Sequence, residues 1–164
     1  MHDLWSLFFH LAGLAAFLVA HGTSAGLAFA LRGERHPERM RRLLELSEGS
    51  FNVLYPAVLV LIAGGVAGAF RRTYWSSGFV WVSIGLLLAA FAIMFVVGGG
   101  QYSVVRKALG IRYREGFKIY PGTGVSATQE EIEDAVARLH PFLLLGTGVV
   151  VIGASLYLMT SKPF

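Results

Sequence analysis

Two histidines, His10 and His21, lie inside an apolar run that extends from Leu4 to Leu31 and carries no formal charge. Imidazole nitrogens are common ligands of haem iron and copper, and they also transfer protons near neutral pH. In a helix the two residues are about three turns apart, so both rings project from one side, about 16 Å apart along the axis. Ionisable groups within a membrane usually face other helices, so we expect this side to point inward. The expected inward stripe consists of His10, Gly13, Phe17, His21 and Ser24.

A third histidine, His140, begins the last apolar segment of the chain. A haem held between two histidines needs ligands at similar depth on different helices, and His21 and His140 would be about 10–15 Å apart along the membrane normal. Ligation by one histidine, either His10 or His21, is an alternative, with water, Met94 or Tyr102 as candidate second partners. An intramembrane imidazole can also simply hydrogen-bond a backbone carbonyl of a neighbouring helix. The candidate cofactor ligands are His10, His21 and His140, and the candidate metal ligands are His10 and His21.

Long apolar segments must position these histidines. Hydrophobic residues make up 55% of the 164 residues and charged residues 15%, and the charges are gathered between the apolar segments. A helix of about 20 apolar residues crosses the hydrocarbon layer of a bilayer. We therefore expect an all-α integral membrane protein, one domain whose four transmembrane helices pack as an antiparallel bundle. The expected spans cover approximately residues 4–31, 51–70, 78–102 and 139–160.

Local signals mark where some of these helices begin and bend. An amphipathic segment precedes the second span, and Gly49 or Pro56 is expected to kink it. Thr128 and Glu131 have the spacing of a capping box, which predicts a helix leading into the fourth span. The Gly-x-Gly within residues 121–124 is interpreted as a turn, because a dinucleotide site needs a strand before it and a helix after it.

Small residues at helical spacing predict where helices approach one another. The patterns Gly22-x-x-x-Gly26 and Gly64-x-x-x-Gly68 are typical of close contacts between membrane helices. The triple glycine at residues 98–100 has three open interpretations: a flexible segment, a close helix contact, or space for a flat ligand.

The Lys and Arg residues predict the orientation of the chain. Most of these 14 residues lie in loops 32–50 and 103–138. Because positively charged loops stay in the cytoplasm, we expect these two loops inside and both termini outside. The net charge of +4 is therefore attributed to topology, and no nucleic-acid partner is predicted. The absence of cysteine excludes disulfides and thiolate chemistry, and His2 and His36 receive no role.

Three stretches resemble a known group of small bacterial membrane proteins. These are Phe8-Phe9-His10-Leu11-x-Gly13, Met40-Arg41-Arg42-Leu43 and Ala63-Gly64-Gly65-x-x-Gly68, all within residues 1–70. The group includes the copper-resistance-D-like domains, the HemJ-type protoporphyrinogen oxidases and uncharacterised four-helix proteins, and the chain is most similar to the last. The resemblance implies a multi-pass protein of the bacterial cytoplasmic (inner) membrane. It also implies a first-span histidine, matched by His10, that is associated with haem in the HemJ-type proteins.

Three functions follow as expectations. The first is a membrane protein that binds b-type haem or porphyrin through an intramembrane histidine in a redox role. The second is a non-catalytic accessory or scaffold subunit of a larger membrane complex, and the third is a permease for copper or another small solute. The lipid bilayer is the expected environment, with a larger membrane complex or a homo-oligomer as candidate partners. Whether the protein is an enzyme is left open.

Overall fold

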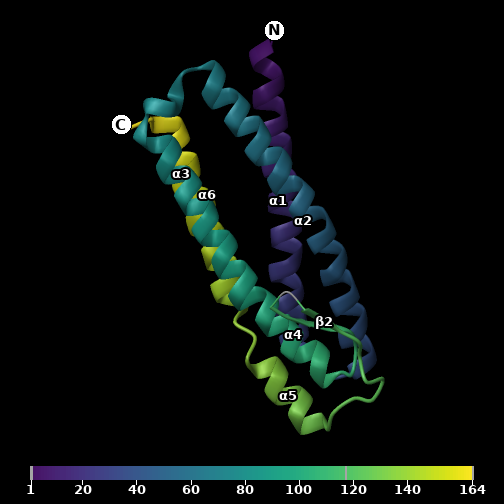
Figure 1. The fold of residues 1–164 in the computed structure, drawn as a ribbon. Helices are drawn as coiled ribbons and strands as arrows, with labels where there is room; N and C mark the ends of the chain where they lie inside the picture. Colours follow the sequence, from purple (N-terminus) through teal and green to yellow (C-terminus); the bar gives the residue numbers. More distant parts are fainter. Residues whose placement is uncertain (1, 117, 164) are drawn as a thin grey trace.

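Long helices make up most of the chain in the computed structural model, which describes residues 2–116 and 118–163 (Figure 1). The helical elements are α1 (His2–Gly33), α2 (Pro37–Arg71), the short turn η1 (Tyr74–Ser76), α3 (Gly78–Ile93), the π-helical turn η2 (Met94–Gly98), α4 (Gly99–Ala108), α5 (Gln129–Ala137) and α6 (Pro141–Ser161). By length and composition, four stretches are long and apolar enough to cross a membrane: Leu4–Gly33, Pro37–Arg71, Gly78–Ala108 and Gln129–Ser161. This confirms the expected helical class and the number of apolar helices. The side chain of His2 lies outside the described part of the chain.

The second and third apolar helices are longer than the sequence suggests. Helix α2 runs without a break from Pro37 through Gly49 and Pro56, so the amphipathic segment and the second span are one helix. The third span continues past residue 102 to Ala108, because α3, η2 and α4 follow one another directly. The π-helical turn η2 therefore lies inside one long helical stretch.

The fourth apolar helix is preceded by a separate short one. Thr128 caps α5 as predicted, since its hydroxyl accepts a bond from the Glu131 amide and the Glu131 side chain accepts one from the Thr128 amide. Helix α5 ends at Ala137, and α6 begins again at Pro141. A proline lacks an N–H group and disfavours helical geometry in the residue before it. His140 accordingly has φ −115° and ψ 71°, and the chain changes direction there.

Helices α1 and α2 pack closely through glycines. A Cβ at Gly13 would come within 2.9 Å of the Ala57 carbonyl oxygen, and a Cβ at Gly64 within 2.9 Å of the His10 Cα. The predicted contact through Gly64 is therefore confirmed. The Gly22-x-x-x-Gly26 pattern does not form such a contact, because a Cβ at either position would meet nothing within 4 Å.

The four long helices form two pairs that converge at one end. Figure 1 shows α1 beside α2 and α3 beside α6, with the pairs close together near α4 and α5 and spread apart toward the chain termini. Helix packing in a membrane depends on small residues and polar contacts, because lipid solvates apolar side chains as well as a neighbouring helix does. The close glycine contacts of the α1–α2 pair thus coincide with the longest region of helix contact.

The main core lies where the two pairs converge. It joins the end of α1, the start of α2, α4, α5 and the start of α6. Arg41 of α2 supports this region, because its guanidinium donates to the Leu109 carbonyl at 3.1 Å and to the Ser126 hydroxyl at 2.9 Å. The buried core residues are Ala28, Leu31, Met40, Leu44, Tyr102, Val105, Leu109, Ile132, Ala135, Val136, Leu139 and Leu144.

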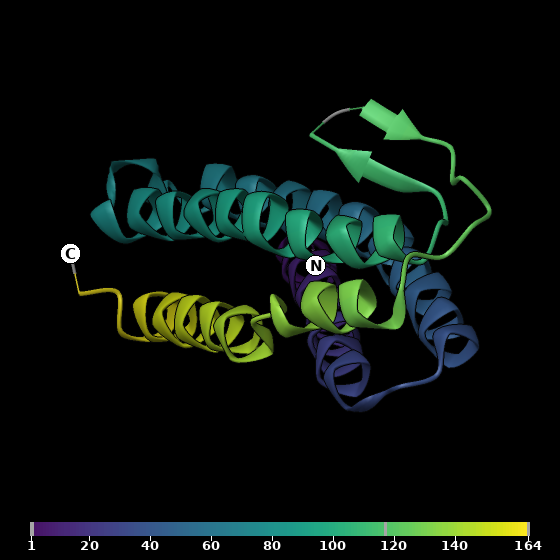
Figure 2. The same ribbon diagram turned by 90° about the horizontal axis from the view of Figure 1, so that it is seen from below.

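A small antiparallel hairpin follows α4, formed by β1 (Tyr113–Glu115) and β2 (Lys118–Tyr120). The sequence pattern does not predict this hairpin. Tyr113 and Tyr120 stack across the two strands with ring centroids 5.3 Å apart. Figure 2 shows the hairpin on the opposite side of α4 from α5. The predicted turn at residues 121–124 is an irregular connection, in which Gly124 has φ +72° and a Cβ at Gly122 would overlap the backbone near Gly110.

Candidate functional site

His21 is buried between α1 and α6. Its ring stacks on Phe17. The ring also packs so closely against α6 that a Cβ at Gly148 would overlap Nε2. The ring hydrogen-bonds the backbone of Leu144, while Nε2 has no partner among the described residues. The adjoining cavity has a volume of about 20 Å³, which holds one water molecule and no porphyrin.

His140 lies away from His21. It is exposed, and its backbone amide donates to the Gln101 side chain at 2.8 Å. His21 meets α6 at Leu144 and Gly148, and Gly148 is about 12 Å further along the helix than His140 at the normal helical rise. The two imidazoles therefore do not face each other across a common site.

His10 packs against α2. Its Nδ1 lies 2.8 Å from the Leu61 carbonyl oxygen, and its ring lies beside Gly65. With the Nδ1 proton donated to Leu61, Nε2 carries the free lone pair, which is the arrangement found in histidines that bind metals. His10 is half-buried, so His10 fits single-histidine ligation better than His21 does. The described residues contain no cluster of three or more His, Asp or Glu side chains that could hold a metal ion.

Tyr102 and Met94, the candidate second ligands of a haem iron, make other contacts. The Tyr102 hydroxyl donates to the Ser24 carbonyl at 2.5 Å and thereby ties α4 to α1. Met94 lies in η2 and lines two cavities, the small one beside His21 and a much larger one. Neither residue is shown beside His10.

The larger cavity has a volume of about 750 Å³ and lies between α2 and the η2–α4 stretch, with the β-hairpin closing one side. Its apolar wall comes from α2, α3 and η2, and its other end is lined by charged side chains. The apolar wall consists of Phe51, Leu54, Tyr55, Phe91, Met94, Phe95 and Val96. The charged end consists of Glu48, Arg106, Lys107, Arg112, Arg114 and Glu115.

The triple glycine borders this cavity. Gly98 packs against the side chain of Leu144, whereas a Cβ at Gly99 or Gly100 would meet nothing within 4 Å. Gly99 and Gly100 both line the cavity. The helix contact and the open space predicted as alternatives thus both occur, at successive residues. Directly before them lies η2, and π-helical turns are often found at functional sites.

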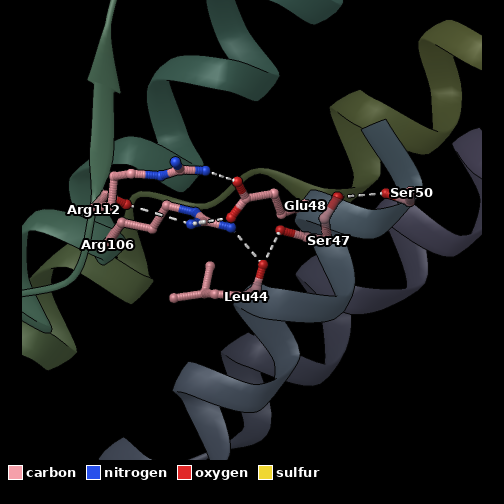
Figure 3. A network of polar contacts seen from close by, with 6 residues as sticks. All are labelled: Leu44, Ser47, Glu48, Ser50, Arg106 and Arg112. Atoms are coloured by element: carbon pink, nitrogen blue, oxygen red, sulfur yellow. Dashed lines mark hydrogen bonds and ion pairs between the residues drawn. The ribbon is translucent and has the colours of Figure 1, made fainter. Parts of the chain in front are cut away.

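Glu48 organises the charged end of the cavity (Figure 3). Its carboxylate accepts from Arg106 at 3.3 Å and also binds Arg112. Arg106 donates in addition to the Leu44 carbonyl, and its side chain is only 13% exposed. Ser47 donates to the same carbonyl at 2.7 Å. One carboxylate of α2 therefore holds two guanidinium groups that are distant in sequence.

The remaining cations of the cavity are held less firmly. Lys107 pairs with Glu115 at 3.2 Å, and both side chains are more than half exposed. The Arg114 side chain forms no hydrogen bond or ion pair with the other described residues. From the sequence, the basic residues of loop 103–138 are attributed to topology, and neither a role for Glu48 nor this cavity is predicted. The triple glycine was the one signal that pointed to it.

The fold and this cavity define a class: a helical protein with four potential membrane spans and an amphipathic cavity at their converging end. The chain matches none of the protein-family models, curated proteins or solved structures with which it was compared. Its function must therefore be inferred from its own residues.

Proposed function

We propose that the four long helices cross the bacterial inner membrane as antiparallel spans. The large exposed apolar side chains on α1, α2, α3 and α6 support insertion, since lipid would solvate them. The distribution of Lys and Arg supports both termini outside and loops 32–50 and 103–138 in the cytoplasm. In that orientation the converging end, with α4, α5 and the hairpin, lies at the cytoplasmic surface.

We propose further that the protein binds an amphiphilic ligand with an anionic head group in the large cavity. The main support for this proposal is the cavity of about 750 Å³, which has an aromatic and aliphatic wall and a cationic end. This volume is within the usual range for small-molecule sites, which are mostly apolar with a few oriented polar groups. The apolar wall fits the hydrocarbon part of the ligand, and the Arg and Lys side chains fit its acidic head.

Exposure of the lining residues supports entry from the bilayer. Val96 is 69% exposed and Tyr55 is 40% exposed, although both line the cavity. In the proposed orientation these side chains face lipid near the cytoplasmic leaflet. A ligand would then move sideways from that leaflet without crossing water.

The experiment is to fill the cavity and measure bound amphiphile. Gly99→Leu places a side chain in the cavity without backbone overlap, because a Cβ at this position meets nothing within 4 Å. We expect native mass spectrometry of the detergent-purified protein to show co-purified amphiphile that Gly99→Leu loses. Gly26→Leu is the matched control, since Gly26 is exposed on α1 and equally open. Retention of the same ligand by Gly99→Leu would contradict the proposal.

Haem binding by His10 is the second candidate function. It is favoured by the bond between His10 Nδ1 and the Leu61 carbonyl, which leaves Nε2 available as a ligand. Bound haem would supply one-electron redox chemistry, and Leu61 would orient the imidazole. We expect protein supplied with haem to show a Soret band that His10→Ala abolishes or shifts and His21→Ala leaves unchanged. Absence of the band from wild-type protein would remove this candidate.

A further inference from the structure

The charged end of the large cavity has an excess of positive charge. Four cationic side chains line it, namely Arg106, Lys107, Arg112 and Arg114, against the two carboxylates of Glu48 and Glu115. A ligand head with net negative charge would complete the balance.

The four cations differ in how free they are to bind a ligand. Arg106 is committed to Glu48 and to the carbonyls of Leu44 and Arg112, and its side chain is 13% exposed. Arg112 shares the Glu48 carboxylate but is 61% exposed. The Arg114 side chain has no ion pair or hydrogen bond with the other described residues. Arg112 and Arg114 are therefore the groups that can receive an anionic head.

We propose that the ligand is a phospholipid with a net negative head group, and that the excess of cationic side chains at this end of the cavity determines the preference. The inference rests on the proposed amphiphile-binding function and names the ligand class for the same cavity. A phosphate diester offers oxygens to both Arg112 and Arg114, and basic pockets at the cytoplasmic ends of spans commonly bind such head groups.

The charged end discriminates between the amphiphiles of a membrane. A fatty acid carries a single carboxylate, which offers fewer oxygens to Arg112 and Arg114 than the head group of a phospholipid does. A zwitterionic phospholipid brings an ammonium group along with its phosphate, so it adds no net charge to balance the excess. The excess of positive charge at this end therefore favours a head group that has a phosphate and no compensating cation.

The test compares four probes on the detergent-purified full chain by native mass spectrometry. The probes are dioleoyl phosphatidylglycerol, dioleoyl phosphatidylethanolamine, oleate and glycerol phosphate. We expect phosphatidylglycerol to bind about three- to fivefold more tightly than phosphatidylethanolamine, the effect of one partly exposed ion pair. Equal binding of the two phospholipids, or equal binding of oleate, would overturn the proposal. Glycerol phosphate binding as tightly as the lipid would assign the site to a soluble phosphate ester instead.

Two matched variants locate the preference in the cavity. Arg114→Gln removes a lining cation that supports no described contact, and we expect it to abolish most of the preference for phosphatidylglycerol. Lys118→Gln removes one cation from the same hairpin, outside the cavity lining, and should leave the preference unchanged. Equal losses in both variants would indicate unspecific charge attraction and contradict the proposal.

A third variant tests the charge balance. Glu48→Gln should strengthen the binding of phosphatidylglycerol relative to phosphatidylethanolamine about three- to fivefold, because it removes one of the two carboxylates and releases Arg112. An unchanged ratio would contradict the proposal. If wild-type protein binds no amphiphile, the proposed function itself fails. If it binds all three lipids equally and Gly99→Leu abolishes that binding, the proposed function stands and only the phospholipid specificity fails.

Discussion

Gly148 of α6 leaves the space that the imidazole of His21 on α1 occupies. A Cβ at Gly148 would overlap Nε2 of that ring, and both residues are buried. This contact joins the α1–α2 pair to the α3–α6 pair above their converging core. His21 therefore acts as a packing residue between the pairs, with a small adjoining cavity of about 20 Å³.

The first prediction concerns this contact. Gly148→Ala should lower the free energy of unfolding by about 1–3 kcal/mol, the usual cost of overpacking. In a His21→Ala background the same change should cost much less, because the overlapping ring is absent. Thermal unfolding in detergent measures the double-mutant cycle. Gly146→Ala is the control, since a Cβ there meets nothing within 4 Å. Additive losses would contradict the assigned contact.

The second prediction concerns the α1–α2 pair. Gly64→Ala should destabilise the protein by about 1–3 kcal/mol, because the new methyl group would overlap the α1 backbone at His10. Gly68→Ala, one turn along the same helix, should be neutral or stabilising by up to about 1 kcal/mol, since its nearest neighbour is 3.8 Å away. Comparison of the unfolding temperatures of the two variants tests this prediction. A larger loss from Gly68→Ala would show that the helices pack through another face.

The third prediction concerns Arg41 as a link between α2 and the end of α4. Arg41→Gln should cost about 1–3 kcal/mol, because the Leu109 carbonyl and the Ser126 hydroxyl lose a charged donor. Arg42→Gln, at an exposed neighbouring position, should change stability by less than about 0.5 kcal/mol. Chemical unfolding in detergent gives both values. Equal effects would mean that net charge, and not this contact, stabilises the region.

The fourth prediction concerns topology. A reporter fused at the C-terminus should be active outside the cytoplasm, and one inserted in the hairpin should be active inside. The C-terminal end and the turn between α2 and α3 should lie on the same side, since Lys162 contacts Tyr74 at 3.1 Å and lowers the pKa of that phenol. An external signal from the hairpin would reverse the proposed orientation and place the large cavity in the outer leaflet.

Local features of this chain could be predicted from the residues alone. The capping box of Thr128 and Glu131 depends on neighbours a few positions away and is confirmed. The break between α5 and α6 is also local, but the sequence pattern was interpreted as one helix leading into the fourth span. The apolar helices likewise follow from runs that only a membrane or a core can accommodate. Helix α2 continues through Gly49 and Pro56, and the expected kink at one of them stays a prediction.

Contacts between distant segments were decided by the tertiary structure. Two similar glycine patterns occur, yet only the one at Gly64 meets another helix, because helix rotation determines which face is covered. His21 and His140 were a candidate pair by depth, and the fold places Gly148 opposite His21 instead. The spacing of residues along a helix predicts which face is buried, but it does not predict which other helix covers that face.

The large cavity shows most clearly which features follow from the sequence and which depend on the tertiary structure. The sequence by itself determined that an acidic residue, several basic residues and three consecutive glycines were present near helix ends. Only the tertiary structure brought Glu48 of α2 to Arg106 and Arg112, and left Gly99 and Gly100 facing open space. The physical reason is that helices and caps arise from interactions between near neighbours, whereas a cavity arises from the packing of helices that no local pattern specifies.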